Sequence, residues 1–437
     1  MKSIGKHAQA PLPEQKLRHL ALRAVALFLL LTIVSCESGA SNSSASKAVS
    51  ARPDDIRLYD DDAGHLWNRI ASALNTWTSK QNGKSIYLED PLLWPNDELS
   101  LTGECQRAAL PLLDDFLMTH GERLVTSPIK RAIFQSNLWL LYDWASAVRE
   151  TGLRKRLAAI MRRVALSTEE IASLPDLYAL GVNSQSNPAA FDADRPDAPF
   201  LPGDLFEPKG PWVLLGDGEG ADRKPLARFH LDFFGGRASF LIFLRVPGTR
   251  DDTLRFLALL RDDRAGENGR TLPPGAQLAL VRRMFLVDAS GRLTPSPIVE
   301  SVQIRVYGDF PGGHKIEGLL QRFVKFELRR KELFANQERS LQAFEQDSEE
   351  PMYFALLGTL NGDSKKSAVP FVRPLGFCSR CHLINAAVES HSRAFLTHVP
   401  RPKLATVSIE EEERRAIAHK SELRSRQLLA SDWKEAK

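Results

Sequence analysis

Two thiols and an imidazole stand close together near the C-terminus of the 437-residue chain, in the stretch Phe377-Cys378-Ser379-Arg380-Cys381-His382. Two cysteines separated by two residues and followed directly by a histidine are typical of covalent c-type haem attachment. In that chemistry each thiol adds to one vinyl group of the porphyrin, and the histidine becomes the proximal ligand of the iron. The spacing therefore predicts that Cys378 and Cys381 attach haem c and that His382 binds its iron.

The residues around the motif do not single out a second axial ligand. No methionine follows the motif, and the candidates are His391, His398 and the upstream Met352. Small electron-transfer cytochromes c usually have a methionine ligand downstream of the motif, and this chain departs from that pattern. Three other uses of the cysteine pair stay open: a disulfide, a zinc site with His382 and either His391 or His398, or a redox-active dithiol.

Residues 1–35 have the pattern of an export signal. The segment carries five basic residues and one acidic residue, and eleven residues from Ala24 to Val34 are apolar except for Thr32. Eleven residues are too few to span a bilayer and suit the apolar core of a signal peptide. The segment ends Leu31-Thr32-Ile33-Val34-Ser35-Cys36, which resembles a bacterial lipobox. That resemblance implies cleavage before Cys36 and its lipidation, and the alternative is a plain signal peptide cut near Ser35.

The same resemblance implies a place in the cell. Residue 37 is Glu and not Asp, which in the sorting rules of Gram-negative lipoproteins implies the outer membrane, with the protein facing the periplasm. The export segment accounts for the whole formal net charge of +4, so the chain from Cys36 onwards is neutral by formal count. This balance gives no reason to expect a nucleic-acid partner. The predicted partners are the membrane, through the lipid anchor, and a redox partner protein.

The body of the chain predicts an α+β, multidomain protein, because a helical period of apolar residues gives way to a period of two. Residues 36–53 carry the lipidated cysteine and form a flexible, serine-rich tether. The predicted order after the tether is a helical domain at 54–185, a proline-rich linker at 186–210, an antiparallel β-rich domain (sandwich or open barrel) at 211–335, a loop or helix segment with the CxxCH motif at 336–403 and a C-terminal helix at 404–437.

Periodicity and turn residues also predict individual elements. The expected helices lie at 65–74, 105–117, 129–148 and 253–260, with a capping box at Ser167-Thr168-Glu169-Glu170. Gly235-Gly236 predicts a hairpin between strands at 227–234 and 237–246. Asp288-Ala289-Ser290-Gly291 predicts a turn after a strand at 277–287, and further strands are expected at 211–216, 301–307 and 319–328.

Two groups of charged residues are expected to have structural roles and no functional ones. Five arginines of the β-rich region are expected on solvated strand faces and not at an anion site: Arg228, Arg237, Arg245, Arg282 and Arg283. Glu410 to Glu413 open the C-terminal helix, where acidic side chains suit the helix dipole.

No motif of a known catalytic class is present: there is no GxSxG, HExxH, phosphate-binding loop or dinucleotide glycine pattern. An electron carrier, haem sensor or binding protein is therefore expected before an enzyme. The first alternative is a lipoprotein that binds an envelope protein or polysaccharide and uses the cysteines as a disulfide or zinc clip; the second is a thiol-disulfide redox protein. The stretches at 130–139, 281–284 and 302–307 resemble lipoproteins of large-genome soil and aquatic bacteria that carry no assigned activity, so this resemblance adds no functional residue.

Overall fold

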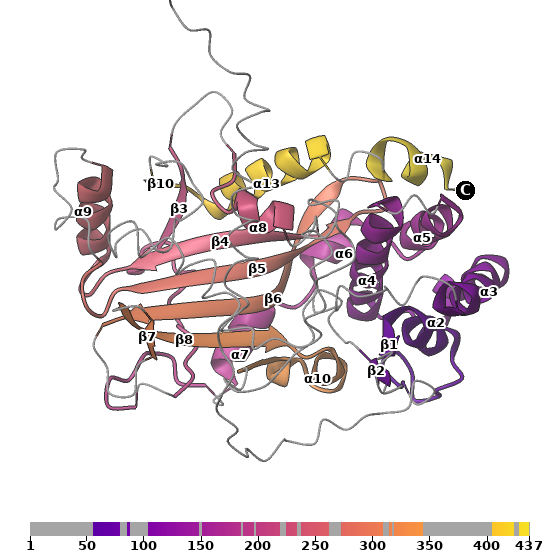
Figure 1. The fold of residues 1–437 in the computed structure, drawn as a ribbon, viewed down its shortest axis with the longest axis horizontal. Coiled ribbons are helices and arrows are strands. Elements are labelled where there is room, and N and C mark those ends of the chain that lie inside the picture. Colours follow the sequence, from indigo (N-terminus) through magenta and orange to yellow (C-terminus); the bar gives the residue numbers. More distant parts are fainter. Residues whose placement is uncertain are drawn as a thin grey trace, which may run out of the picture. The chain divides into compact units, whose positions relative to one another are not determined.

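The computed structural model describes residues 56–78, 85–87, 104–147, 151–184, 187–195, 198–218, 224–233, 237–261, 272–308, 314–316, 319–343, 404–423 and 428–436. They all belong to one compact unit within Ser50–Tyr353 and Ala368–Lys437. The fold is α+β, as the sequence predicts, with helices beside an antiparallel sheet (Figure 1).

The first part of the described chain is helical. Its longer helices are α2 (Leu66–Asn75), α3 (Glu104–Thr119), α4 (Pro128–Ala147) and α5 (Thr151–Arg163). Short α6 (Thr168–Ala172) and α7 (Leu177–Asn183) follow, and β1 (Thr76–Thr78) pairs with β2 (Ser85–Tyr87). The aromatic side chains Phe134, Trp139 and Tyr142 of α4 are at most 1% exposed and therefore belong to the core.

One antiparallel sheet holds the other eight described strands, in the order β10-β3-β4-β5-β6-β8-β7 with β9 also paired to β8. The strands are β3 (Val213–Asp217), β4 (Ala238–Arg245), β5 (Gln277–Val287), β6 (Leu293–Tyr307), β7 (His314–Ile316), β8 (Leu319–Leu328), β9 (Leu341–Ala343) and β10 (Leu404–Thr406). These eight strands therefore form a single antiparallel sheet with two open edges, and not the predicted sandwich or open barrel.

Side chains two residues apart along a strand lie on the same face of a sheet. Apolar residues gather in this way on one face of this sheet. Val281, Val302 and Phe326 are aligned across β5, β6 and β8 and have no exposed surface. Phe200 and Leu201, from the proline-rich stretch predicted to be a linker, pack against this face with at most 1% exposure.

The helices and the sheet are joined by polar contacts as well as by a shared apolar cluster. Gln135 of α4 is 2% exposed; its Nε2 donates to the Val287 carbonyl oxygen at 2.8 Å, and its Oε1 accepts from the Val287 N–H at 3.0 Å. Arg237, before β4, donates from Nη1 to the Ser136 carbonyl oxygen at 2.9 Å. Phe240 and Phe285 of the sheet lie in the same cluster as Trp67 and Trp139 of the helices.

The first strand of the hairpin predicted around Gly235-Gly236, at 227–234, is wrong. Residues Arg228–Phe233 form the helix α8, and the strand β4 begins only at Ala238. Ala227 and Leu231, four residues apart, are both 2% exposed and enter the same cluster. A short apolar run fits a helix or a strand equally well until its packing partners are known.

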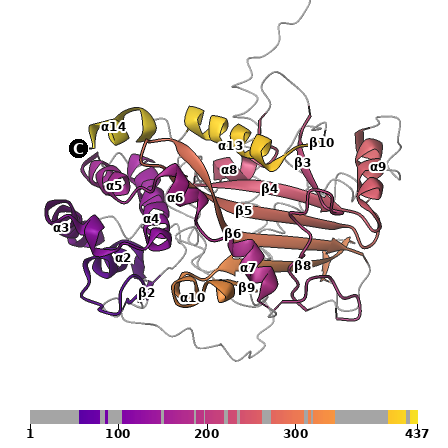
Figure 2. The same cartoon turned by 180° about the vertical axis from the view of Figure 1, so that it is seen from behind.

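The last part of the chain returns to the sheet and the helices. After β10, the helix α13 (Ile409–Leu423) lies beside β4 and α8 (Figures 1 and 2). The π-helical turn η7 (Leu428–Asp432) and the short α14 (Trp433–Glu435) contact α5. Two further helices lie in the second part of the chain: α9 (Arg250–Arg261) follows β4, and the short α10 (Arg330–Ala335) follows β8.

The capping box predicted at the start of α6 is confirmed. The Glu170 N–H donates to Ser167 Oγ at 3.1 Å, and the Ser167 N–H donates to Glu170 Oε2 at 2.7 Å. We expect Ser167→Ala to lower the free energy of unfolding by about 1 kcal/mol, because the Glu170 N–H in the first turn loses its side-chain acceptor. Urea unfolding followed by circular dichroism measures the change. The exposed Ser173→Ala, whose hydroxyl donates only to the Glu169 carbonyl oxygen, is the control, and equal losses in the two variants would contradict a specific role of the cap.

Candidate functional site

The residues that the sequence selects for haem chemistry all lie outside the described residues. They are the attachment cysteines Cys378 and Cys381, the proximal His382, the distal candidates His391, His398 and Met352, and the lipidation site Cys36. The described chain nevertheless fixes where the stretch that carries the motif leaves the fold and where it re-enters.

The two ends of that stretch lie at opposite edges of one sheet. It follows β9, which pairs with β8, and it precedes β10, which pairs with β3. Six strand-to-strand steps separate β9 from β10 in the sheet order, or about 29 Å at the usual spacing of neighbouring strands. Along the chain, the motif therefore lies between two strands of the same sheet.

Helix α13, just after β10, covers an open edge of the sheet. The strand β3 pairs with β4 only from Ile242 to Leu244, so the register of β3 stops short of residues 238–241. Lys420 of α13 donates from Nζ to the Ala238 carbonyl oxygen at 2.7 Å. A helix placed along a strand in this way satisfies edge groups that could otherwise pair with another chain.

Two glutamates on the inner face of α13 are buried beside this edge. Glu413, 5% exposed, lies over the cross-strand pair formed by Ser239 of β4 and Arg283 of β5. Its Oε1 is 2.9 Å from Arg283 Nη1 and accepts a hydrogen bond from Ser239 Oγ at 3.4 Å. This carboxylate therefore has a close cationic partner.

Glu412, 1% exposed, has a different environment. Its Oε1 accepts a hydrogen bond from the Leu226 N–H at 2.6 Å, just before α8. Its Oε2 lies 3.6 Å from Arg415 Nη1 and makes no hydrogen bond. The Arg415 guanidinium is directed at other acceptors, because Nε donates to Glu411 Oε1 at 2.8 Å and Nη1 to the Asp217 carbonyl oxygen at 3.0 Å.

These surroundings shift the acidity of both carboxyl groups. Burial raises the pKa of Glu412 to about 7, although the Leu226 N–H and Arg415 act in the opposite direction. Burial also raises the pKa of Glu413, while Arg283 and Ser239 lower it. Buried carboxyl groups that titrate near neutrality are a recognised mark of functional sites, although structural ion pairs show them too. The arrangement can hold and release one proton at Glu412 near neutral pH.

Sequence reasoning missed this cluster. The solvated strand faces expected for the arginines are wrong at three positions, because Arg237 is 2% exposed, Arg282 is 7% exposed and Arg228 lies in the helix α8. In the structure, Glu412 and Glu413 lie on the same helical face as the buried Ala416 and Lys420. A face that carries two glutamates and a lysine shows no apolar stripe, so the sequence alone does not mark it as buried.

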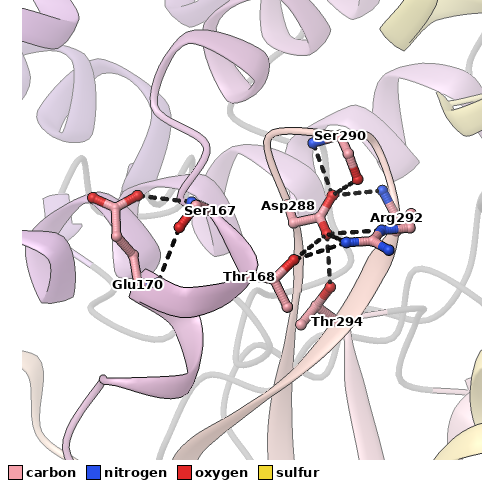
Figure 3. A network of polar contacts seen from close by, with 7 residues as sticks. All are labelled: Ser167, Thr168, Glu170, Asp288, Ser290, Arg292 and Thr294. Atoms are coloured by element: carbon pink, nitrogen blue, oxygen red, sulfur yellow. Dashed lines mark hydrogen bonds and ion pairs between the residues drawn. The ribbon is translucent and has the colours of Figure 1, made fainter.

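A second polar cluster joins α6 to the predicted turn at Asp288 (Figure 3). Asp288 is 1% exposed, and its Oδ1 accepts from the Ser290 N–H, Ser290 Oγ and the Arg292 N–H at 2.6–2.9 Å. Its Oδ2 accepts from Thr168 Oγ1, Arg292 Nε and Thr294 Oγ1 at 3.0–3.3 Å. Every carboxylate lone pair is directed at a protein donor, so this cluster is a structural joint.

Burial raises the pKa of Asp288, but the hydrogen bonds from Ser290, Arg292 and Thr168 outweigh it and bring the value to about 2. Asp288 is therefore fully ionised at neutral pH, whereas Glu412, with a pKa of about 7, is close to half ionised there.

Within the described part of the chain, no group of three or more metal-binding side chains comes together. The helices in those same ranges are all too short or too polar to cross a bilayer. In comparisons with protein-family models, curated proteins and solved structures, the chain matches none.

Proposed function

We propose that the protein is a lipid-anchored envelope protein that carries one covalent haem c and acts in electron transfer or in haem-based sensing. The observation that carries the proposal is the sequence Cys378-Ser379-Arg380-Cys381-His382 behind an export signal that ends at Cys36. Export matters because haem is attached to thiols outside the cytoplasm, where thiols otherwise form disulfides.

The donor set fits the group. Cys378 and Cys381 would hold the porphyrin through two thioethers, and His382 would bind the iron. His391, His398 and Met352 are the candidates for the opposite ligand. Haem supplies an iron centre whose axial ligand and surroundings decide between electron transfer and the binding of a small gas.

The sheet supports the proposal through the position of the motif. Sixty residues connect β9 to β10, far more than the chain needs to cover about 29 Å. Both strands that flank this stretch in sequence are fixed by pairing. A lipid anchor at Cys36, followed by the tether at 36–53, would keep this unit close to the outer membrane and within reach of a redox partner protein in the periplasm.

A pyridine-haemochrome spectrum of the membrane fraction tests the proposal, after expression of the full chain together with a cytochrome c maturation system. We expect an α band of the two-thioether type that stays with the polypeptide after denaturation. A folded, lipidated and colourless protein would contradict the proposal. Thiol titration and zinc analysis of that same protein would then distinguish a disulfide, a free dithiol and a zinc clip.

A further inference from the structure

The docking of helix α13 on the open edge of β4 depends on two carboxylates that are unequally compensated. Glu413 has the Arg283 guanidinium at 2.9 Å and a hydroxyl donor. Glu412 has one backbone donor and a guanidinium 3.6 Å away that donates to two other acceptors. When it is ionised, Glu412 is thus the less stabilised of the two.

An ionised carboxylate without full compensation is costly inside a protein, whereas the neutral acid needs only ordinary hydrogen bonds. With a proton on Oε2, Glu412 keeps its bond from the Leu226 N–H and loses the desolvation cost of the charge. The docked position of α13 therefore favours the protonated side chain.

We propose that α13 is a pH-sensitive latch, docked on the β4 edge while Glu412 holds a proton and loosened when Glu412 ionises. The latch lies where α13 contacts β4, β3 and the residues just before α8. Besides Glu412, the helix is held by Lys420 on the Ala238 carbonyl oxygen and by Arg415 on the Asp217 carbonyl oxygen. These contacts lie directly after β10, so the latch adjoins the point where the CxxCH-bearing stretch re-enters the fold.

Charged and titratable groups from several elements surround Glu412. The helix α13 itself contributes Glu411, Glu413, Arg415, His419 and Lys420; β3 contributes Asp217; β5 contributes Arg283 through Glu413; and α8 carries Arg228 and His230. Asp217 and Glu411 oppose the ionisation of Glu412, and Arg415 favours it. His230 and His419 are the other groups near the latch whose ordinary pKa lies near neutrality, and the experiment has to separate them from Glu412.

The direction of the effect follows from linkage. The pKa of Glu412 rises from its ordinary value of 4.5 to about 7 in the folded protein. Between these values the docked state holds a proton that the released state does not, so docking is strongest below about pH 4.5 and weakens as pH rises through about 7. Between pH 6 and pH 8 the released fraction is expected to increase about tenfold.

Hydrogen–deuterium exchange of the full-length protein at pH 6 and pH 8 tests the latch, after correction for the base-catalysed rise of intrinsic exchange. In the wild type, peptides from α13 and from the start of β4 are expected to lose about tenfold in protection at pH 8, while peptides from α4 keep theirs. Glu412→Gln keeps an acceptor for the Leu226 N–H but cannot ionise, so its α13 peptides are expected to keep equal protection at both pH values. Glu410→Gln, an exposed change on the same helix, is the matched control and should behave as the wild type.

Several outcomes would overturn the latch. Protection of α13 that does not change with pH in the wild type refutes it, and this measurement does not depend on the folding of any variant. A pH dependence that persists in Glu412→Gln also refutes it, because the effect then belongs to another titratable group of the interface, such as Glu413, His230 or His419. A loss of protection in α4 equal to that in α13 refutes it as well, because it would show global unfolding.

Discussion

Replacement of both Cys378 and Cys381 by alanine is expected to abolish covalently bound haem. In the proposed haem protein each thioether requires one of these sulfur atoms, and His382 alone would hold the iron only through a reversible bond. The denatured polypeptide should then lose both the haemochrome band and the additional mass of the porphyrin. Haem staining after denaturing electrophoresis and intact-mass measurement check this directly.

Single replacements give a sharper form of the same test. Cys378→Ala or Cys381→Ala leaves one vinyl group unreacted and conjugated with the porphyrin, so the haemochrome band should move to longer wavelength. Cys105→Ala, which removes a thiol of α3 far from the motif in sequence, is the matched control and should keep the wild-type band. Covalent haem that survives in the double variant would show that the attachment site is elsewhere.

The central strands of the sheet could be predicted from the sequence because their information is local. The predicted bounds of β5 and β8, Gln277–Val287 and Leu319–Leu328, agree with the structure. Alternation of apolar residues and the turn at Asp288 suffice to define these strands. The prediction failed at α8, where the packing of Ala227 and Leu231 decides between helix and strand.

The buried charges could not be predicted in this way because their partners are distant in sequence. Glu412 meets Leu226 across 186 residues, and Glu413 meets Ser239 across 174 residues. A pattern of acidic residues at a helix start predicts a favourable dipole interaction whether the side chains face water or the core. Only the docking of α13 on β4 shows that two of them are desolvated. This desolvation raises the pKa of Glu412 to about 7.

The position of the latch also follows from topology. Strand β10 and helix α13 lie next to each other in the chain, and Val407 between them donates from its N–H to the Leu214 carbonyl oxygen of β3 at 3.2 Å. Gly216 of β3 has no room for a side chain there, because a Cβ atom would come too close to Val407. The chain just after β10 is therefore held by the close packing of Val407 on β3, and further along by the contacts of α13.

Asp288→Ala is expected to be the most destabilising of the single substitutions proposed for the described part of the chain, with a loss of about 3 kcal/mol in the free energy of unfolding. The substitution leaves the N–H groups of Ser290 and Arg292 without their acceptor, and it disconnects Thr168 of α6 from the β5–β6 turn. Asp288→Asn keeps an oxygen for the two N–H groups but places an amide opposite Arg292 Nε, so an intermediate loss is expected. Urea unfolding at pH 7 measures all three proteins.

The pH dependence of this loss identifies its cause. The folded pKa of Asp288, about 2, lies below its ordinary value of 3.8, so the ionised carboxylate stabilises the fold above about pH 4. That contribution is lost as pH falls from about 4 to about 2. The difference in stability between the wild type and Asp288→Ala should therefore narrow over this range. The exposed Asp192→Ala, which removes a similar turn carboxylate, should change stability little at any pH. A difference for Asp288→Ala that stays constant down to pH 2 would show that the side chain acts through packing and not through its charge.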